Sequence, residues 1–204
     1  MPQLTEIRVA GFGGQGVILS AMVVGKAYSV FDGGFATLTQ AFGPEARGGA
    51  CSAQVITSDE PVLYPYITQA DILVVMSQEA FTKFISGLKP GGTLLVEQDL
   101  VQVTQLPPGV RLFRCPATRI AEQLGKRMVL NIVIVGFFAA VTQTVRAESL
   151  RRAVAESVPE HFKDINLQAF DAGYKQGLAT LKSFPEGEPL EMSAAVSTST
   201  AKRC

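Results

Sequence analysis

The spacing of hydrophobic and polar positions changes repeatedly along the chain, and each change predicts a new element. Residues 6–11 alternate between apolar and polar side chains, which predicts a strand, whereas residues 15–31 repeat apolar positions at helical spacing. Residues 71–77 form a continuous apolar run, typical of a strand buried on both faces. The same criteria predict further strands at 35–42, 50–58, 93–98 and 110–115, and helices at 78–88, 117–125, 129–145, 147–158 and 161–183.

The order of these elements defines the expected fold class. Strands that alternate with helices are typical of an α/β domain with a Rossmann-like, open, mainly parallel sheet flanked by helices. Residues 1–184 are expected to form this single domain. Residues 185–204 lose the periodicity and are small, polar and proline-containing, so we expect a disordered tail there.

Composition narrows the class of protein but leaves two interpretations of its surface. The 18 Lys+Arg residues balance the 18 Asp+Glu residues, so nothing favours binding to nucleic acid or to an anionic membrane. Charged residues make up only 18% of the chain and hydrophobic residues 47%. This composition fits either a surface hidden against partner subunits or simply a well-buried α/β core.

Signals for a membrane or for secretion are not found. The longest apolar run, residues 128–141, is too short to span a bilayer, and the N-terminus lacks the basic and apolar regions of a secretion signal. The cysteines Cys51, Cys115 and Cys204 form no CxxC pair. We therefore expect a cytoplasmic chain that builds no iron–sulfur or zinc site of its own.

The segment GFGGQG, between the first predicted strand and the first predicted helix, carries the clearest functional signal. Gly11, Gly13 and Gly16 have the spacing G-x-G-x-x-G, with Gly14 between them. Glycines allow positive φ and let backbone N–H groups approach a phosphate, which the N-terminus of the following helix also attracts. The segment therefore predicts either a site for a phosphate-bearing ligand or a tight turn that only packs the helix on the strand.

Among phosphate-bearing ligands, a nicotinamide dinucleotide is disfavoured. Its ribose calls for an acidic residue near the end of the second strand, and residues 35–42 contain none. Asp32 precedes that strand, and Glu45 lies well past it. A P-loop is excluded because no GK[ST] follows the glycines.

A second glycine-rich loop, residues 43–49, follows the second predicted strand. Gly43 and two further glycines surround Arg47, whose guanidinium presents a fork suited to a carboxylate or a phosphate, and Glu45 is placed to orient it. The loops after the first and second strands of a doubly wound sheet open at one edge, so both glycine loops are expected to face one site. The alternative is a surface turn with a solvated Glu/Arg pair.

No complete set of residues for covalent or metal catalysis is present. His161 is the only histidine, and its acidic neighbours favour a solvated or capping role. Cys51 and Cys115 lie in predicted strands, where buried and inert thiols are expected. Four polar residues at strand ends and at a helix start are candidates for lining a pocket, with caps and turns as the alternative: Thr39, Gln40, Ser77 and Asn131.

Three segments resemble one known family. They are EIRVAGFGGQGV (6–17), TQAFGPEARGGACSAQVITSDEPVLYP (39–65) and ADILVVMSQEAF (70–81). With MVLNIVIVGFFAA and NLQAFDAGY further on, the chain resembles the γ subunits of 2-oxoacid:ferredoxin oxidoreductases over about residues 5–180. The form GPEARGG is most similar to the 2-oxoglutarate branch, and the fold implied is that of the γ domain, or domain III, of pyruvate:ferredoxin oxidoreductase.

The resemblance implies a subunit of a larger enzyme. Partner α and β subunits would hold thiamine diphosphate with Mg²⁺ and [4Fe–4S] clusters, and electrons would pass to ferredoxin or, through a flavin subunit, to NAD. The 2-oxoacid is decarboxylated and its acyl group passes to coenzyme A, giving succinyl-CoA in the 2-oxoglutarate branch. This chain would have no catalytic residue and would help to bind coenzyme A and to assemble the complex. The residues implied for coenzyme A are Gly11, Gly13, Gly14, Gln15, Gly16, Thr39, Gln40, Gly43, Glu45, Arg47, Ser77 and Asn131.

Two alternatives to this interpretation stay open. One is a purely structural subunit whose glycine loops only make tight contacts with the partners. The other is the γ subunit of a related pyruvate, indolepyruvate or phenylglyoxylate oxidoreductase. An independent dinucleotide-binding oxidoreductase is a third possibility, which the missing ribose-binding acid disfavours.

Overall fold

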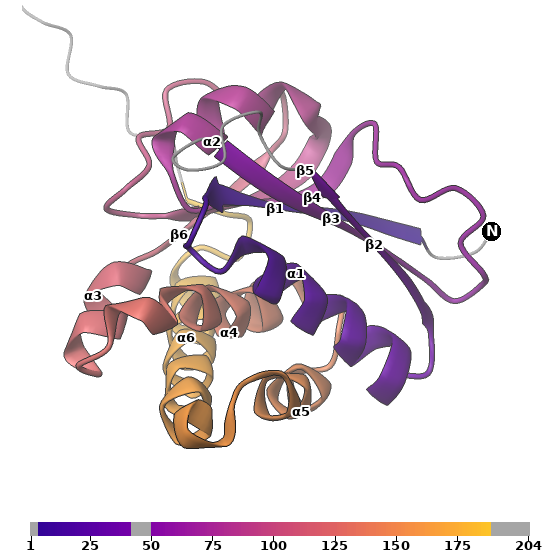
Figure 1. Ribbon diagram of the computed structural model, residues 1–204. Helices are drawn as coiled ribbons and strands as arrows, with labels where there is room; N and C mark the ends of the chain where they lie inside the picture. The colour runs from indigo at the N-terminus through magenta and orange to yellow at the C-terminus, as the bar shows by residue number, and fades with distance from the viewer. Residues whose placement is uncertain (1–3, 42–49, 189–204) are drawn as a thin grey trace, which may run out of the picture.

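A six-stranded sheet with the order β2-β3-β1-β4-β5-β6 forms the centre of the molecule (Figure 1). The computed structural model describes residues 4–41 and 50–188. Only β3 of the described strands runs against the others, because it pairs antiparallel with both β1 and β2, whereas β1, β4, β5 and β6 pair in parallel. The mainly parallel sheet expected from the sequence is thereby confirmed. The strands are β1 (Leu4–Phe12), β2 (Phe35–Ala41), β3 (Ala50–Ser58), β4 (Ala70–Val75), β5 (Leu88–Glu97) and β6 (Arg111–Cys115).

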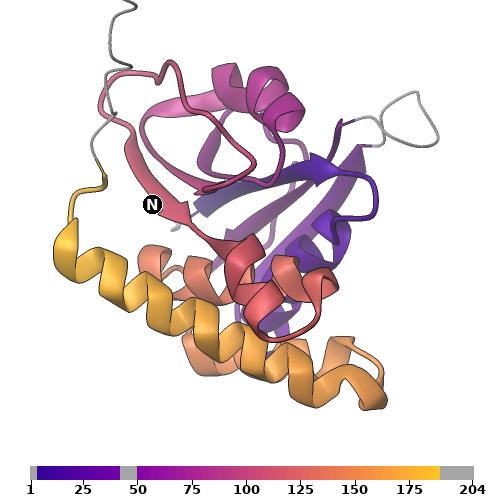
Figure 2. The same ribbon diagram turned by 90° about the vertical axis from the view of Figure 1, so that its left-hand side faces the viewer.

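Helices cover the two faces of the sheet unequally, as Figures 1 and 2 show. α2 (Gln78–Phe84) packs on one face and builds a small core there. The layer on the other face consists of α1 (Val17–Lys26), α3 (Ala117–Gln123), α4 (Leu130–Thr142), α5 (Ala147–Ser157) and α6 (Lys163–Ser183). A π-helical turn at Ala27–Phe31 extends α1, and 3₁₀ turns at Ile85–Gly87, Arg127–Val129 and Glu160–Phe162 flank α2, α4 and α6.

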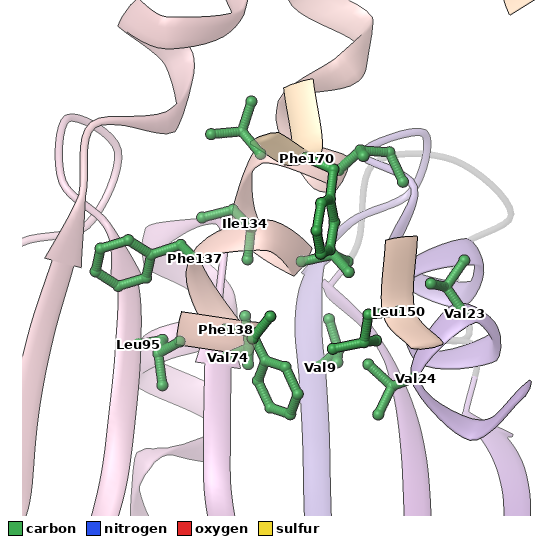
Figure 3. Close-up of a cluster of buried hydrophobic side chains, with 14 of the residues drawn as sticks. Val9, Val23, Val24, Val74, Leu95, Ile134, Phe137, Phe138, Leu150 and Phe170 are labelled. Carbon is green, nitrogen blue, oxygen red and sulfur yellow. The ribbon is translucent and has the colours of Figure 1, made fainter. Parts of the chain in front are cut away.

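The larger core lies between the sheet and α4. Every residue of α4 from 130 to 141 is buried, because the sheet lies on one side of the helix and α6 on the other. Figure 3 shows Phe138 of α4 beside Val74 and Leu95 of the sheet, with Phe170 of α6 farther from the strands. A helix that is apolar all round is thus explained by burial on both sides rather than by a membrane. No described helix is long and apolar enough to cross a membrane.

The contact between α4 and α6 is made through glycine backbone. A Cβ on Gly173 would overlap the carbonyl group of Val133, and a Cβ on Gly136 would overlap that of Phe170. These glycines let the two helix backbones touch, which leaves no room for any side chain at the crossing point.

Three predicted elements are wrong in their limits. The helix predicted at 78–88 ends at Phe84, because Ile85–Gly87 tighten into a 3₁₀ turn. β5 already begins at Leu88 instead of residue 93, and a register shift against β4 accommodates the KPGG segment within the strand rather than in a loop. The helix predicted at 15–31 begins only at Val17, because Gly16 adopts the left-handed conformation.

Residues 185–188, which the sequence assigns to the tail, pack against β6. The backbone N–H of Glu188 donates to the Leu112 carbonyl oxygen at 2.6 Å, and its carboxylate pairs with Arg114 at 3.2 Å. The rest of the expected tail, residues 189–204, lies outside the described residues.

Candidate functional site

The glycine turn lies at the edge of the sheet where the parallel strands end. Phe12 at the end of β1 pairs with Ala50 of β3. Ala41 at the end of β2 pairs with Ser52, only two residues further along β3, so β1 and β2 end at the same edge. In open α/β sheets, ligands bind outside this edge.

At three of the four glycine positions in the turn, the backbone conformation or the surrounding packing disfavours any other residue. Gly14 and Gly16 are left-handed, with φ of 96° and 72°, where side chains are disfavoured. A Cβ on Gly16 would also overlap the side chain of Asn131. Gly11 has no left-handed φ, but a Cβ there would lie 2.6 Å from the Oε1 atom of Gln15.

Gly13 is different, because none of the described residues requires a glycine at this position. Its φ lies outside the left-handed region, and a Cβ would meet no atom of residues 4–41 or 50–188 within 4 Å. Gly13 therefore leaves open space over the turn that packing of the described residues does not explain.

Gln15 fixes the backbone of the turn. Its Oε1 accepts a hydrogen bond from the Phe12 N–H at 2.6 Å, and its Nε2 donates to the Met76 carbonyl oxygen at 3.0 Å. The backbone N–H of Gln15 also donates to the Phe12 carbonyl oxygen at 3.1 Å. The turn is thus tied to the residue that follows β4 and is preformed.

The N-terminus of α1 begins directly at this turn. Gly16 is its N-cap residue, no side chain caps the helix, and its first turn contains no acidic residue. The first N–H groups of a helix have no partner within the helix and carry partial positive charge. The start of α1 is therefore suited to an anion.

A pocket of about 320 Å³ adjoins the turn. Its walls combine the turn with the loop after β5 and the start of α4, and the lining residues are Gly14, Gln15, Leu100, Arg127, Met128 and Leu130. The Arg127 side chain is 68% exposed, and its ion pair with Glu122 is long, at 3.9 Å. The guanidinium is therefore placed to attract an anion at the pocket. The sequence analysis missed Arg127, although the basic pair Lys126–Arg127 directly precedes the apolar run 128–141 and could have drawn attention to it.

A neighbouring pocket of about 240 Å³ is mostly apolar and shares Met128 with the first. Leu19 of α1, Phe162 and Ile165 of the region that begins α6, and Val158 are among its lining residues. The two pockets together offer a space of mixed polar and apolar lining beside the glycine turn and a mostly apolar space behind Met128.

A buried carboxylate holds the wall that carries Leu100. Glu97, at the end of β5, is fully buried and accepts hydrogen bonds from the backbone N–H groups of Asp99 and Leu100, each at 2.7 Å. Its other oxygen accepts from the Thr118 N–H at 2.9 Å. These three bonds satisfy the buried carboxyl oxygens and fix both the loop after β5 and the start of α3. Sequence reasoning missed Glu97, because nothing along the chain distinguishes it from a solvated residue at a strand end.

Ser77 and Asn131 lie beside the turn, where both make structural bonds. Ser77 is 3% exposed and accepts a hydrogen bond from the Ala80 N–H at 3.3 Å, which makes it the N-cap of α2. Asn131 is 4% exposed and donates to the Gly16 carbonyl oxygen at 3.4 Å. Asn131 thus supports the turn from α4.

Thr39 and Gln40 point to opposite faces of β2, as neighbouring residues of a strand must. Thr39 donates to the Oε1 atom of Gln54 at 3.3 Å on the face away from α1. Gln40 is exposed on the face that carries α1. The structure therefore does not bring the two side chains together. Gly43, Glu45 and Arg47 lie outside the described residues.

Asp32, an acid that the sequence analysis considered for a ribose, lies at the end of the π-helical turn and bonds to the start of α5 instead. Its carboxylate accepts hydrogen bonds from the Arg146 backbone N–H at 3.0 Å, from the Arg146 Nε at 2.7 Å and from the Ser149 hydroxyl. Burial raises the pKa of Asp32, but the bonds from Ser149 and Arg146 outweigh burial and hold that pKa below its ordinary value. Asp32 therefore ties the end of the first helical segment to the start of α5.

The two thiols in the described residues show no sign of activation, and the histidine lies on the surface. Burial raises the pKa of the Cys115 thiol well above its ordinary value, and Glu97 adds to this shift. Burial also raises the pKa of Cys51. His161 is exposed and stacks at a tilt on Phe162, with ring centroids 4.1 Å apart. Within residues 4–41 and 50–188, no three His, Cys, Asp or Glu side chains gather as they would around a metal ion.

The fold and the turn define an α/β domain with a preformed, glycine-lined turn at the carboxyl edge of its sheet, in a geometry suited to an anion. A family model described as pyruvate ferredoxin/flavodoxin oxidoreductase matches residues 6–176, and the chain belongs to this family.

Relatives within the family are subunits of 2-oxoacid enzymes. The 2-oxoglutarate synthase subunit KorC of Methanocaldococcus jannaschii is 43% identical over 172 residues, which cover 83% of this chain and 92% of that protein. KorC of Methanothermobacter marburgensis is 45% identical over 174 residues, which cover 82% of this chain and 94% of that protein.

Solved structures share the fold. The γ subunit of a keto/oxoacid ferredoxin oxidoreductase from Geobacter sulfurreducens superposes with a TM-score of 0.78 at 40% identity and covers 87% of this chain and 98% of its own. A 2-oxoglutarate:ferredoxin oxidoreductase from Magnetococcus marinus, solved with 2-oxoglutarate, coenzyme A and succinyl-CoA bound, gives a TM-score of 0.80 at 22% identity. That match covers 94% of this chain but 33% of the longer chain, and it is a likeness of fold.

Proposed function

We propose that this chain is the γ subunit of a 2-oxoglutarate:ferredoxin oxidoreductase and that its glycine turn binds the phosphates of coenzyme A. The identity of 43–45% to two 2-oxoglutarate synthase subunits supports the 2-oxoglutarate branch. The enzyme would convert 2-oxoglutarate and coenzyme A to succinyl-CoA and CO₂ while reducing ferredoxin.

The observation that carries the role in binding is the open space at Gly13. A tight turn that served only to pack α1 on β1 would need Gly11, Gly14 and Gly16, whose conformation or surroundings demand glycine. It would not need Gly13, over which a Cβ meets no atom of the described residues within 4 Å. A glycine at position 13 is explained if a ligand approaches the backbone there, because a side chain would block that approach.

Coenzyme A matches the chemistry of the site. Its pyrophosphate and 3′-phosphate are anions without any demand for the ribose-binding acid of a nicotinamide site, and Asp32 is engaged elsewhere with Arg146. The uncapped start of α1 and the Arg127 guanidinium would stabilise phosphate charge. The apolar pocket behind Met128 would accept a less polar part of the same molecule. From the sequence alone, Arg47 is a second candidate for contact with phosphate.

The remaining cofactors belong to partner subunits in this proposal. Thiamine diphosphate with Mg²⁺ and the [4Fe–4S] clusters would be held by α and β subunits, as the family resemblance implies. This chain would take part in assembly as well as in binding coenzyme A, and the complex would work in the cytoplasm.

The test is a substitution that fills the space over the turn without disturbing the fold. Gly13→Leu in the assembled complex should raise the KM for coenzyme A at least tenfold, while the KM for 2-oxoglutarate and the Tm stay unchanged. Ala179→Leu, at an exposed position of α6, adds a comparable apolar side chain elsewhere and should leave all three values unchanged.

Each outcome distinguishes the candidates. An unaltered KM for coenzyme A in an intact Gly13→Leu complex would mean that the turn is structural and that this subunit serves assembly alone. Turnover of pyruvate or an aryl 2-oxoacid in place of 2-oxoglutarate would move the chain to another branch of the family.

A further inference from the structure

The loop between β3 and β4 lies at the end of the sheet opposite the glycine turn (Figure 1). Large apolar side chains of this loop are exposed. Leu63 is 95% exposed, Tyr64 69% and Tyr66 62%. The rings of Tyr64 and Tyr66 lie edge to face, with centroids 5.6 Å apart. Single exposed apolar residues are ordinary, but three within four positions are not.

Two further apolar side chains extend this surface along the sheet. Ser58, from which the loop departs, pairs with Leu4 on one side and with Phe35 on the other. Leu4 is 48% exposed and Phe35 45%, and strand alternation places both on the face that the loop covers. We call Leu4, Phe35, Leu63, Tyr64 and Tyr66 together the Tyr64 patch.

The loop that carries the Tyr64 patch is held in place by its backbone. Arg8 and Gln54 face each other across β1 and β3, and both reach Ile67. An Arg8 Nη2 donates to the Ile67 carbonyl oxygen at 3.3 Å, and the Gln54 Oε1 accepts from the Ile67 N–H at 3.3 Å. Both backbone groups of one loop residue are therefore satisfied by side chains of the sheet.

Apolar contacts anchor the loop as well. Ile67 is 6% exposed and packs with Ile56 and Ala70, while Val62 covers the same small cluster. The residues that point inward thus fix the loop, and those that point outward form the patch. A surface fixed in advance loses little conformational entropy when a partner binds, which is typical of interaction sites rich in tyrosine.

Charge decides between a second copy of this chain and a different partner. The loop from 59 to 69 contains two acidic residues, Asp59 and Glu60, and neither Lys nor Arg. Self-association through a two-fold axis would bring the same acidic rim against itself, and like charges at an interface are unfavourable. A partner with an apolar surface and a basic rim fits both the apolar and the acidic parts.

We infer that the Tyr64 patch is the surface by which this chain docks onto another subunit of its oxidoreductase, through an apolar area on that subunit edged by Lys and Arg. This inference rests on the proposed function for the existence of such a partner. Docking there leaves the glycine turn, at the opposite end of the sheet, accessible to its ligand.

The test is assembly of the complex from co-expressed α, β and γ chains. The variant Leu63→Ser, Tyr64→Ser, Tyr66→Ser should lower the amount of α and β recovered with the tagged γ chain at least tenfold. Its Tm should stay within a few degrees of wild type, because Val62 and Ile67 still anchor the loop. The matched control Val30→Ser, Leu178→Ser removes exposed apolar side chains elsewhere, and assembly should be unchanged.

The outcomes separate the two proposals. Wild-type recovery of α and β by the triple variant would overturn the docking surface while leaving the subunit assignment intact. A wild-type γ chain that recovers neither α nor β would overturn both. An isolated wild-type chain that forms a dimer in analytical ultracentrifugation, and a triple variant that is monomeric, would show a second copy as the occupant and overturn the choice of partner.

Discussion

At both ends of the sheet, side chains of the strands or of the turn hold a loop by hydrogen bonds to its backbone. The surfaces that the two loops expose differ in chemistry. At the carboxyl edge, Gln15 holds the glycine turn by bonds to the backbone at Phe12 and Met76. At the other end, Arg8 and Gln54 hold the β3–β4 loop by bonds to Ile67. In both places a polar side chain satisfies backbone groups that no regular element can satisfy.

The difference lies in what each fixed loop exposes. The glycine turn has almost no side chains, so its surface is backbone N–H groups and the start of a helix, which suit a small anion. The β3–β4 loop exposes Leu63, Tyr64 and Tyr66, which suit the wide apolar surface of a protein. One scaffold thus separates the proposed site for a small ligand from the proposed docking surface by about the length of a strand.

The largest expected effect on stability comes from Gly16→Ala, which breaks the carboxyl end alone. A left-handed backbone costs a residue other than glycine about 1–2 kcal/mol, and overlap with Asn131 adds about 1–3 kcal/mol. We therefore expect the free energy of unfolding to fall by about 3 kcal/mol in urea denaturation. In the Gly16→Ala variant, the amides of the β3–β4 loop should keep the same ranking of hydrogen-exchange rates as in the wild type, measured under native conditions.

Gly25→Ala is the matched control for that substitution. Gly25 lies in the same helix, its φ is not left-handed, and a Cβ would sit at an ordinary 3.6 Å from Val55. Helix propensity predicts a gain of up to about 1 kcal/mol. A loss at Gly25 as large as that at Gly16 would show that α1 tolerates no added methyl group, and the argument from the turn's conformation would fail.

Hydrophobic periodicity was sufficient to predict the order of helices and strands. Most features of the candidate site depend on contacts between distant parts of the chain, which the sequence does not reveal. The strand at 50–58 and the apolar strand that became β4 follow directly from local patterns. The reasons for Gly11, Gly13 and Gly16 could not be told apart in the sequence. The three glycines differ in the room that the folded chain leaves for a Cβ atom. The side chain that crowds Gly16 belongs to Asn131, more than a hundred positions away in the sequence.

Long-range packing also explains what sequence reasoning missed. Arg127 reaches the pocket only because α4 returns beside α1, and Glu97 is identifiable as a buried acid only once Thr118 and the loop after β5 close over it. The 78–88 helix was extended too far because a 3₁₀ turn and a helix share the same local apolar spacing.

A second prediction concerns pH and the end of the molecule away from the glycine turn. The pKa of Asp32 lies below its ordinary value of 3.8, so this carboxylate stabilises the fold above pH 3.8, and the stabilisation is lost as pH falls through the folded-state pKa. Asp32→Asn should lower the free energy of unfolding by about 2 kcal/mol at pH 7, because charge-assisted bonds to Arg146 and Ser149 are weakened. Denaturation of both proteins at pH 7, 5 and 3 should show this difference shrinking only at the lowest pH.

The control for Asp32 is Glu148→Gln, because Glu148 is an exposed acid in α5, the helix to whose start Asp32 bonds. Its effect should be within about 0.5 kcal/mol at every pH. A difference between wild type and Asp32→Asn that is unchanged down to pH 3 would contradict the role given to the carboxylate charge.

A smaller effect is expected from Gln54→Leu, which loosens the β3–β4 loop without touching the patch itself. The Ile67 N–H loses its acceptor, which costs about 1 kcal/mol. Native-state hydrogen exchange should show faster exchange at Ile67 and its neighbours, with no change at the glycine turn. Equal acceleration at both ends would mean that the two loops are one cooperative unit, and the comparison between them would not hold.

The smallest effect is a gain in stability at Gln143, which ends α4 at the side away from the glycine turn. Gln143 is the one residue other than glycine with a positive φ, 53°, among the residues that the structure describes, and its side chain is exposed. Glycine is favoured at this position after a helix, so Gln143→Gly should raise the free energy of unfolding by about 0.5–1 kcal/mol. Gln143→Ala, which keeps a Cβ in the same conformation, should give no gain. A gain of equal size in the alanine variant would show that the long side chain, and not the left-handed backbone, is the source of strain at this end of α4.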